Sequence, residues 1–155
     1  MSVMAESISR AEEKDAPILD KLITKEFTYK GLSKEKIIER MKNPEIFIFK
    51  KTVDDILAGF VELDTKGGEA FMNAVGVVEG QRGKGYGREL VEYVSEFARA
   101  GGYPKIGLLV KKDNEKAKKI YSKMGFAFVK FYRKVIDGSV VEVWEREFAQ
   151  NRAIA

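Results

Sequence analysis

The 155-residue chain contains neither cysteine nor histidine. These two absences exclude a disulfide framework, a cysteine nucleophile, a Cys/His zinc site and a histidine general base, and we expect no metal centre. No run of residues approaches the roughly 18 apolar residues of a membrane-spanning helix. The start of the chain lacks the basic and apolar regions of a secretory signal, so we expect a cytoplasmic protein with no membrane partner.

Positive charge is only slightly in excess, with 28 Lys and Arg against 24 Asp and Glu, a formal net charge of +4 and a pI of about 9.1. This balance suits an anionic ligand. The densest basic cluster, at Lys116, Lys118 and Lys119, follows Asp113 and Glu115, which favours a solvated helix face. We therefore expect no nucleic-acid partner.

The length suits one globular domain, and no repeat, low-complexity tract or linker divides the chain. We expect a single domain over 1–155, with a core over about 8–148 and a frayed tail over 149–155. Hydrophobic periodicity and turn signals predict four helices, beginning near Pro17, Ser33, Tyr86 and Asn114. They also predict seven strands, at 7–11, 45–51, 56–64, 69–78, 105–110, 126–135 and 140–148.

The order of these elements predicts a mixed, mostly antiparallel seven-stranded sheet flanked by about four helices, an α+β (α/β) fold. Short turns join the strands over 45–78, which is typical of an antiparallel meander. A helix lies between the strands over 69–78 and 105–110, so these two should pair in parallel through a right-handed crossover. Asp137 and Gly138 should close a final hairpin.

A basic glycine-rich turn joins the strand over 69–78 to the next helix, with the sequence VEGQRGKGYG over 78–87. Glycines allow backbone N–H groups to converge on a phosphate, and Arg82 and Lys84 add full positive charges at the helix N-terminus. A P-loop would need Ser or Thr at Gly85, and a dinucleotide fingerprint would need Gly at Arg88. The alternative to a phosphate site is a tight turn with no ligand.

The signature around this turn resembles that of the GCN5-related N-acetyltransferase (GNAT) family, whose pattern of Arg or Gln, two residues, Gly, one residue, then Gly or Ala is matched by Arg82, Gly85 and Gly87. The next helix resembles the family as well, through Asn114, Ala117, Tyr121, Gly125 and Phe126. In element order the resemblance covers about residues 8–148, and its motifs occupy 75–126.

The resemblance implies that acetyl-CoA lies where the sheet is splayed between its two central parallel strands. Backbone groups of the strand would pair with pantetheine, and an N–H near Val75 or Gly76 would polarise the thioester carbonyl. The family's cofactor-binding positions correspond here to Val75, Gly76, Val77, Gln81, Arg82, Gly83, Lys84, Gly85, Tyr86, Gly87, Asn114, Ala117 and Tyr121. A family member transfers acetyl directly to an amine, which agrees with the absence of cysteine.

The resemblance makes Tyr121 the candidate acid that protonates the leaving thiolate. Asn114 and Tyr121 lie two helical turns apart, so they share one helix face. Packing in the core is the alternative interpretation for Tyr121. Asn114 is also a typical N-cap, and that role is compatible with contact to a cofactor.

The general base is harder to assign, because 108–110 carry Leu, Leu and Val where some relatives place a Glu. If Asp64 pairs with Glu69 across the turn, Glu62 opposes Phe71 and shares a face with Val75. A proton path through Glu62 and water follows from that register. The alternative is a Glu on the sheet face, paired with a cation or solvated.

The favoured function is an acetyl-CoA-dependent N-acetyltransferase acting on a primary amine of a small molecule, a peptide N-terminus or a lysine. The alternative is a non-catalytic acyl-CoA-binding or regulatory module of the same family, since no strand carboxylate is found. A nucleic-acid-binding domain is a third hypothesis, based only on the pI. Acceptor specificity should lie in 27–45 and the final hairpin, and either a monomer or a homodimer is compatible with the sequence.

Overall fold

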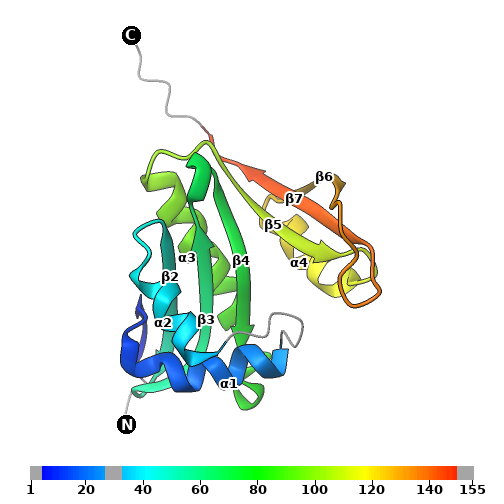
Figure 1. Ribbon diagram of the computed structural model, residues 1–155. Helices are drawn as coiled ribbons and strands as arrows, with labels where there is room; N and C mark the ends of the chain where they lie inside the picture. The colour runs from blue at the N-terminus through cyan, green and yellow to red at the C-terminus, as the bar shows by residue number, and fades with distance from the viewer. Residues whose placement is uncertain (1–4, 27–32, 150–155) are drawn as a thin grey trace.

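A computed structural model describes residues 5–26 and 33–149, which form a central sheet with helices on both faces (Figure 1). In chain order the elements are β1 Glu6–Arg10, η1 Glu13–Asp15, α1 Ala16–Glu26, α2 Lys34–Lys42, β2 Ile46–Val53, β3 Ile56–Asp64, η3 Lys66–Gly68, β4 Ala70–Val77, η4 Glu79–Gln81, α3 Tyr86–Ala100, β5 Lys105–Lys111, α4 Glu115–Lys123, β6 Ala127–Phe131 and β7 Val141–Glu147. The seven strands and four α-helices of the described residues confirm the expected fold class.

The helices form two layers with separate apolar cores. α1 and α2 cover one face, where Leu19, Ile23 and Ile37 pack with β2 and β3 residues such as Phe60. α3 and α4 cover the other face. The α2 helix begins as the sequence predicts, because the Ser33 hydroxyl accepts a hydrogen bond from the Lys36 N–H.

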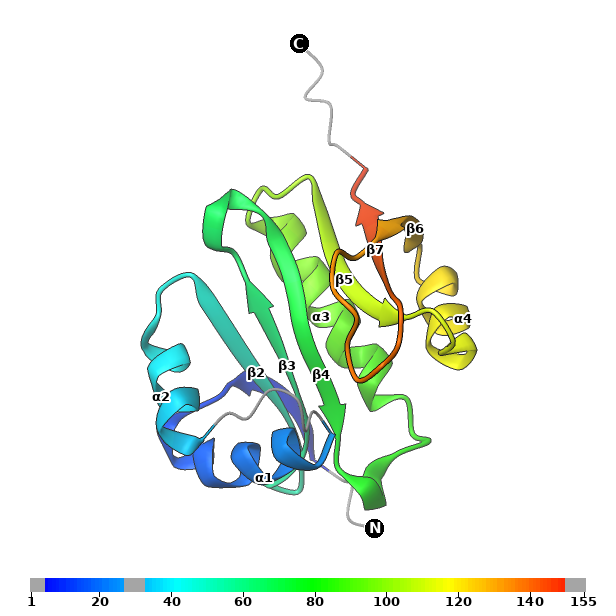
Figure 2. The same ribbon diagram turned by 45° about the vertical axis from the view of Figure 1, so that its right-hand side comes forward.

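The sheet order is β1-β2-β3-β4-β5-β7-β6, and all neighbours are antiparallel except β4 and β5. The expected parallel pair is thus confirmed. Its ladder joins only residues 70–72 of β4 to 106–108 of β5. Beyond these positions the two strands separate toward their carboxyl ends, as Figure 2 shows. The sheet is therefore open at its centre.

The expected register between β3 and β4 is wrong. Asp64 pairs with Phe71 because the turn contains a 3₁₀ segment, Lys66–Gly68, and Glu69 lies outside the strand. A register shift lies between Leu63, which pairs with Met72, and Glu62, which pairs with Ala74. Asn73 is therefore an extra residue in β4 with no partner in the β3 register. Because directly opposed residues share a face, Glu62 lies on the α2 face of the sheet.

The final hairpin forms, but its first strand ends at Phe131 instead of continuing to 135. The backbone stays beside β7 for one more hydrogen bond, from the Tyr132 N–H to the Val141 carbonyl, and then leaves the sheet. The turn has the expected residues, with Asp137 and Gly138 both at positive φ between Ile136 and Ser139.

The expected frayed tail falls mainly on 150–155, and six of the residues expected to set acceptor specificity fall on 27–32. Both segments lie outside the described residues. Within the described part of the chain, none of the helices is both long and apolar enough to cross a bilayer.

Candidate active site

A cavity of about 560 Å³ occupies the opening between β4 and β5. It is bounded by 71–75 of β4, 109–111 of β5, the start and face of α4, and the loop after β6. Its floor is formed by strand segments that have no partner across the opening, since the parallel ladder stops at residues 72 and 108. Unpaired backbone groups are thus available to a ligand that lies between the strands.

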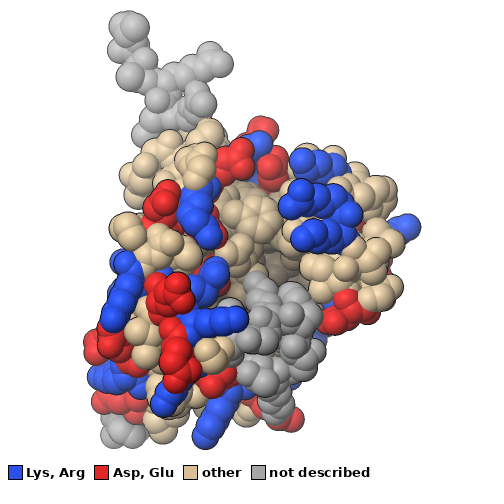
Figure 3. Space-filling view, in the orientation of Figure 1, with Lys and Arg blue, Asp and Glu red and all other residues tan. Residues whose placement is uncertain are grey.

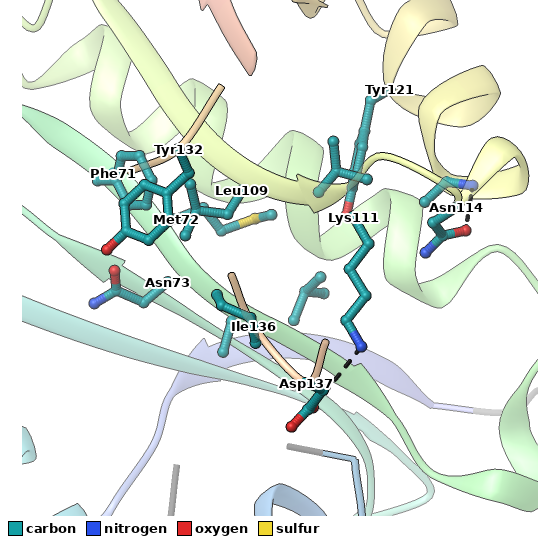
Figure 4. Close-up of a pocket in the computed structure, with 14 residues that line it drawn as sticks. Phe71, Met72, Asn73, Leu109, Lys111, Asn114, Tyr121, Tyr132, Ile136 and Asp137 are labelled. Carbon is teal, nitrogen blue, oxygen red and sulfur yellow. Dashed lines mark hydrogen bonds and ion pairs between the residues drawn. The ribbon is translucent and has the colours of Figure 1, made fainter. Parts of the chain in front are cut away.

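Four predicted site residues meet at this cavity: Val75, Asn114, Ala117 and Tyr121. Figure 4 shows Tyr121 extending from α4 toward the opening, with Asn114 at the start of the same helix. Asn114 is the N-cap of α4, because its Oδ1 accepts the Ala117 N–H at 3.1 Å. The cap fixes the start of the helix that carries Tyr121.

Tyr121 is largely enclosed, and burial raises the pKa of its phenol above the ordinary value. Its ring packs edge-on against Phe126, with 5.8 Å between ring centroids. The phenol is therefore protonated at neutral pH, as a proton donor must be. Tyr121 both packs against Phe126 and lines the cavity, so its position is compatible with either interpretation.

A second cavity of about 140 Å³ lies between the start of α3, at Gly87 to Val91, and the face of α4 that runs from Ala117 to Met124. It shares Val75, Ala117 and Tyr121 with the larger cavity, and Gly87 also lines it. An elongated ligand can therefore run from the glycine turn to the centre of the sheet.

The glycine turn after β4 has the geometry that its sequence indicates. Gly83 and Gly85 adopt positive φ of 80° and 84°, and a Cβ at either would meet no atom within 4 Å. Arg82 Nε donates to the Val77 carbonyl at 3.2 Å, and Lys84 Nζ donates to Gln81 Oε1 at 3.1 Å. The turn thus presents cations and an open glycine backbone at the N-terminus of α3.

Glu62 does not line the cavity. It is buried under α2, where its Oε1 accepts Arg40 Nε at 2.6 Å and lies 2.5 Å from Arg40 Nη2. Its neighbour Ala74 does line the cavity, so Glu62 is one strand removed from the opening. The structure therefore separates Glu62 from Tyr121 and Val75.

The final hairpin was expected to set acceptor specificity, but none of its individual residues was predicted at the cavity. Tyr132, Ile136 and Asp137 reach it from the loop after β6, opposite Phe71 and Asn73 of β4 (Figure 4). The Asp137 carboxylate lies 3.8 Å from Lys111 Nζ. The Asp-Gly turn signal locates this loop in the sequence, but its position over the sheet is visible only in the tertiary structure.

The sheet is opened between its central strands, and a basic glycine turn precedes α3; this arrangement suits a ligand with a phosphate end and an extended polar arm. Comparison of the sequence with known families matches residues 11–126 to the Acetyltransferase (GNAT) family. This match covers most of the chain, so the protein belongs to that family.

Two curated relatives match over short segments. A mycothiol acetyltransferase of Jonesia denitrificans is 42% identical over 53 residues, which are 34% of this chain and 17% of that protein. The uncharacterized N-acetyltransferase YycN of Bacillus subtilis is 38% identical over 58 residues, 37% of each chain. The matched part of the chain thus spans well under half the length of these relatives.

Solved structures share the fold over nearly the whole chain. Ard1 of Thermoplasma volcanium superposes with a TM-score of 0.82 at 21% identity, covering 94% of this chain and 99% of that one. The PaiA N-acetyltransferase of Thermoplasma acidophilum, solved in complex with coenzyme A, gives a TM-score of 0.76 at 21% identity and covers 94% and 100%.

Proposed function

We propose that the protein is an acetyl-CoA-dependent N-acetyltransferase that transfers acetyl directly to a primary amine. The observation that carries this proposal is the opening between β4 and β5, whose cavity shares Val75, Ala117 and Tyr121 with a second cavity that reaches Gly87. Family membership and the acetyltransferase names of the two relatives support it.

The residues of the opening fit acetyl-CoA. The amides of 81–87, with Arg82 and Lys84, suit its pyrophosphate. Among the described residues, the edge of β4 over 75–77 has no strand partner on the β5 side, and it suits the amides of pantetheine. Asn114, Ala117 and Tyr121 line the path between them. When bound, acetyl-CoA supplies an activated acetyl thioester.

Two groups of the chain have proposed chemical roles. A backbone N–H near Val75 or Gly76 donates to the carbonyl oxygen where negative charge develops. Tyr121 gives its phenolic proton to the sulfur as the C–S bond breaks and the C–N bond forms. The rest of the rate enhancement comes from holding the amine beside the thioester.

The attacking amine must also lose a proton, and two carboxylates are candidates to receive it. Glu62 can act only through water, because Arg40 holds it beneath α2. Asp137 lines the cavity directly, opposite Lys111. The acceptor is an amine of a small molecule, a peptide N-terminus or a lysine that enters between Phe71 and the hairpin.

Calorimetry with acetyl-CoA tests the cofactor assignment. Gly85→Glu places bulk and negative charge at the phosphate position, and we expect it to abolish binding. Gly85→Asn is the matched control, since Asn tolerates positive φ and adds no charge. Circular dichroism must show that both variants are folded. Unchanged affinity in folded Gly85→Glu would exclude the turn as the pyrophosphate site.

A non-catalytic acyl-CoA-binding module is the second candidate. The observation in its favour is that both nearby carboxylates are engaged, Glu62 by Arg40 and Asp137 by Lys111. Release of free CoA, followed with a panel of primary amines, separates the two functions. Saturable CoA binding without release on any amine would favour the module.

A further inference from the structure

Exposed apolar side chains gather on β6 and the hairpin loop. Of the ten large apolar residues that are exposed in the described part of the chain, five lie within 128–140: Phe128, Val129, Phe131, Val135 and Val140. Phe131 is 55% exposed and Val135 64%. A concentration of this kind on a polar surface marks an interaction site.

A stretch that overlaps this region carries a large excess of positive charge. Residues 111–134 contain nine Lys and Arg but only two acidic residues, so their net charge of +7 exceeds the +4 of the whole chain. Lys112, Lys130, Arg133 and Lys134 have no ion-pair partner among the described residues. Figure 3 shows Lys and Arg side chains gathered over the part of this face where β6 and the hairpin lie.

Within β6 itself, the Phe and Lys side chains are sorted onto opposite faces, whereas Lys112 of the loop after β5 lies 5.7 Å from the centroid of the Phe131 ring. Phe128 and Phe131 oppose Trp144 and Glu142 of β7, two residues apart, so they share one face. Their rings meet edge-on with centroids 5.2 Å apart. Lys130 opposes Val143 and therefore lies on the other face. The sorting depends on the register shift at Val129.

β6 is also the last strand of the sheet, and all five of its residues are exposed. Its outer backbone N–H and C=O groups have no strand partner within the described residues. An edge of this kind is a template for an added strand.

We propose that the β6 surface, formed by Phe128, Val129, Phe131, Lys112, Lys130, Arg133 and Lys134, binds an extended acidic segment of another polypeptide as an eighth strand. The apolar side chains of that segment pack beside the two Phe rings, and its carboxylates face the cations. Its backbone completes the hydrogen bonds of the β6 edge. This binding does not depend on acetyl transfer.

Three other occupants suit the surface less well. A second copy of the chain would bring two regions of +7 together at the same edge, which like-charge repulsion opposes. A lipid bilayer would accept the Phe and Lys side chains but leave the backbone groups of the edge unpaired. An oligonucleotide offers phosphates to the cations, but it has no alternating donors and acceptors at strand spacing.

Fluorescence anisotropy with defined probes tests the proposal. The probe is a labelled ten-residue peptide of alternating Glu and Val. Control peptides carry Lys in place of Glu, Ser in place of Val, or methyl groups on all central amide nitrogens. We expect each control peptide to bind about tenfold more weakly or worse, because each removes charge attraction, apolar contact or backbone pairing alone.

The protein variants locate the site. We expect Lys130→Glu with Lys134→Glu, and separately Phe131→Ser, to weaken binding of the Glu-Val peptide about tenfold. Lys34→Glu with Lys36→Glu on exposed α2 is the charge-matched control and should bind almost as well as wild type, with only a small loss from the change in net charge. All these positions are exposed, so melting temperatures should change little.

Four outcomes would overturn the proposal. The first is that the N-methylated peptide binds as tightly as the Glu-Val peptide, and the second is that the α2 and β6 charge variants lose equal affinity for the Glu-Val peptide. The third is that a labelled 15-nucleotide uridine oligomer or phosphatidylserine vesicles bind more tightly than the Glu-Val peptide. The fourth is that sedimentation shows a dimer of the protein that the peptide does not dissociate. An absence of any peptide binding at low salt would also overturn it.

Discussion

At the scale of single residues, Tyr121 combines burial with a position on the cavity, and burial raises its pKa. We expect Tyr121→Phe to lower kcat by about 10²- to 10⁴-fold, because the ring keeps its contact with Phe126 while the donor is lost. The dissociation constant of acetyl-CoA, measured by calorimetry, should change little.

The matched control is Tyr103→Phe, which removes a phenol from a partly buried ring that does not line the cavity. Its kcat should equal that of wild type. Undiminished turnover in Tyr121→Phe would assign Tyr121 to packing with Phe126 alone.

Substitution of Glu62 tests how the acceptor amine loses its proton. At pH 7 a lysine of pKa about 10.4 costs roughly 4.6 kcal/mol to deprotonate, whereas an α-amine of pKa about 8 costs roughly 1.4 kcal/mol. A relay through Glu62 therefore matters more for alkyl amines. We expect Glu62→Gln to lower kcat/KM more for an alkyl amine than for an α-amine, measured from pH 6 to 10.

Arg40→Gln is the companion variant, since it breaks the same buried pair but leaves the carboxylate in place. Loss of packing and charge balance beneath α2 is common to both variants, whereas loss of the relay is confined to Glu62→Gln. Equal losses for both amines in Glu62→Gln would leave Glu62 as an anchor for α2 and move the proton path to Asp137.

At the scale of elements, buried Lys51 joins three of them. From β2, its ammonium lies 2.8 Å from Glu6 of β1 and 2.6 Å from Glu89 of α3, and it sits 4.9 Å from the centroid of the Tyr86 ring. Burial acts to lower the pKa of Lys51, but the hydrogen bonds to the two carboxylates outweigh it and raise the pKa. The cluster fixes the first turn of α3, directly after the glycine turn.

The raised pKa predicts how stability depends on pH. The stabilisation is fully present below the unfolded-state pKa of about 10.4 and is lost as pH rises through the higher folded-state value. We expect the melting temperature of wild type to fall above about pH 10, and that of Lys51→Met to be lower at neutral pH and to fall less.

Lys50→Met provides the comparison. Lys50 pairs with Asp15 on the opposite face, at 2.9 Å, and does not contact α3. We expect Lys50→Met to destabilise the fold without changing the dissociation constant of acetyl-CoA. Lys51→Met should destabilise the fold and also weaken acetyl-CoA binding. Identical affinities in the two variants would show that the Lys51 cluster does not support the glycine turn.

At the scale of the whole molecule, charge is unevenly distributed: 111–134 carry +7, and the remaining residues together carry −3. The positive part borders the cavity through Lys111 and α4. We expect the association rate of acetyl-CoA to fall as salt rises from 0.05 to 0.5 M, because the Debye length shrinks from roughly 14 Å to roughly 4 Å. Stopped-flow fluorescence measures this rate.

Acetyl-pantetheine, which carries no phosphate, is the control ligand. Its association rate should be nearly independent of salt. If salt lowers the association rates of both ligands by the same factor, the salt dependence arises from a change in the protein and not from electrostatic steering of the phosphates.

The sequence predicts the fold well where local signals decide it. Glycines at positive φ, the Ser33 and Asn114 caps and the strand-helix-strand order all have direct counterparts in the structure. The register of Glu62 was not predictable, since it depends on an extra residue at Asn73 and a 3₁₀ turn that no periodicity encodes. The hairpin residues Tyr132 and Ile136 were missed because only tertiary contact brings them to the cavity.

The three-residue ladder between β4 and β5 has a consequence for how the protein loses its structure. Few backbone bonds join the β1–β4 part to the β5–β7 part, so local opening at this seam should expose the β5 amides of the ladder, at 106–108, before global unfolding. A ligand that bridges the seam suppresses the opening. We expect hydrogen exchange at 106–108 to slow by about 100-fold, which corresponds to about 2.7 kcal/mol, when acetyl-CoA is present at 100 times its dissociation constant.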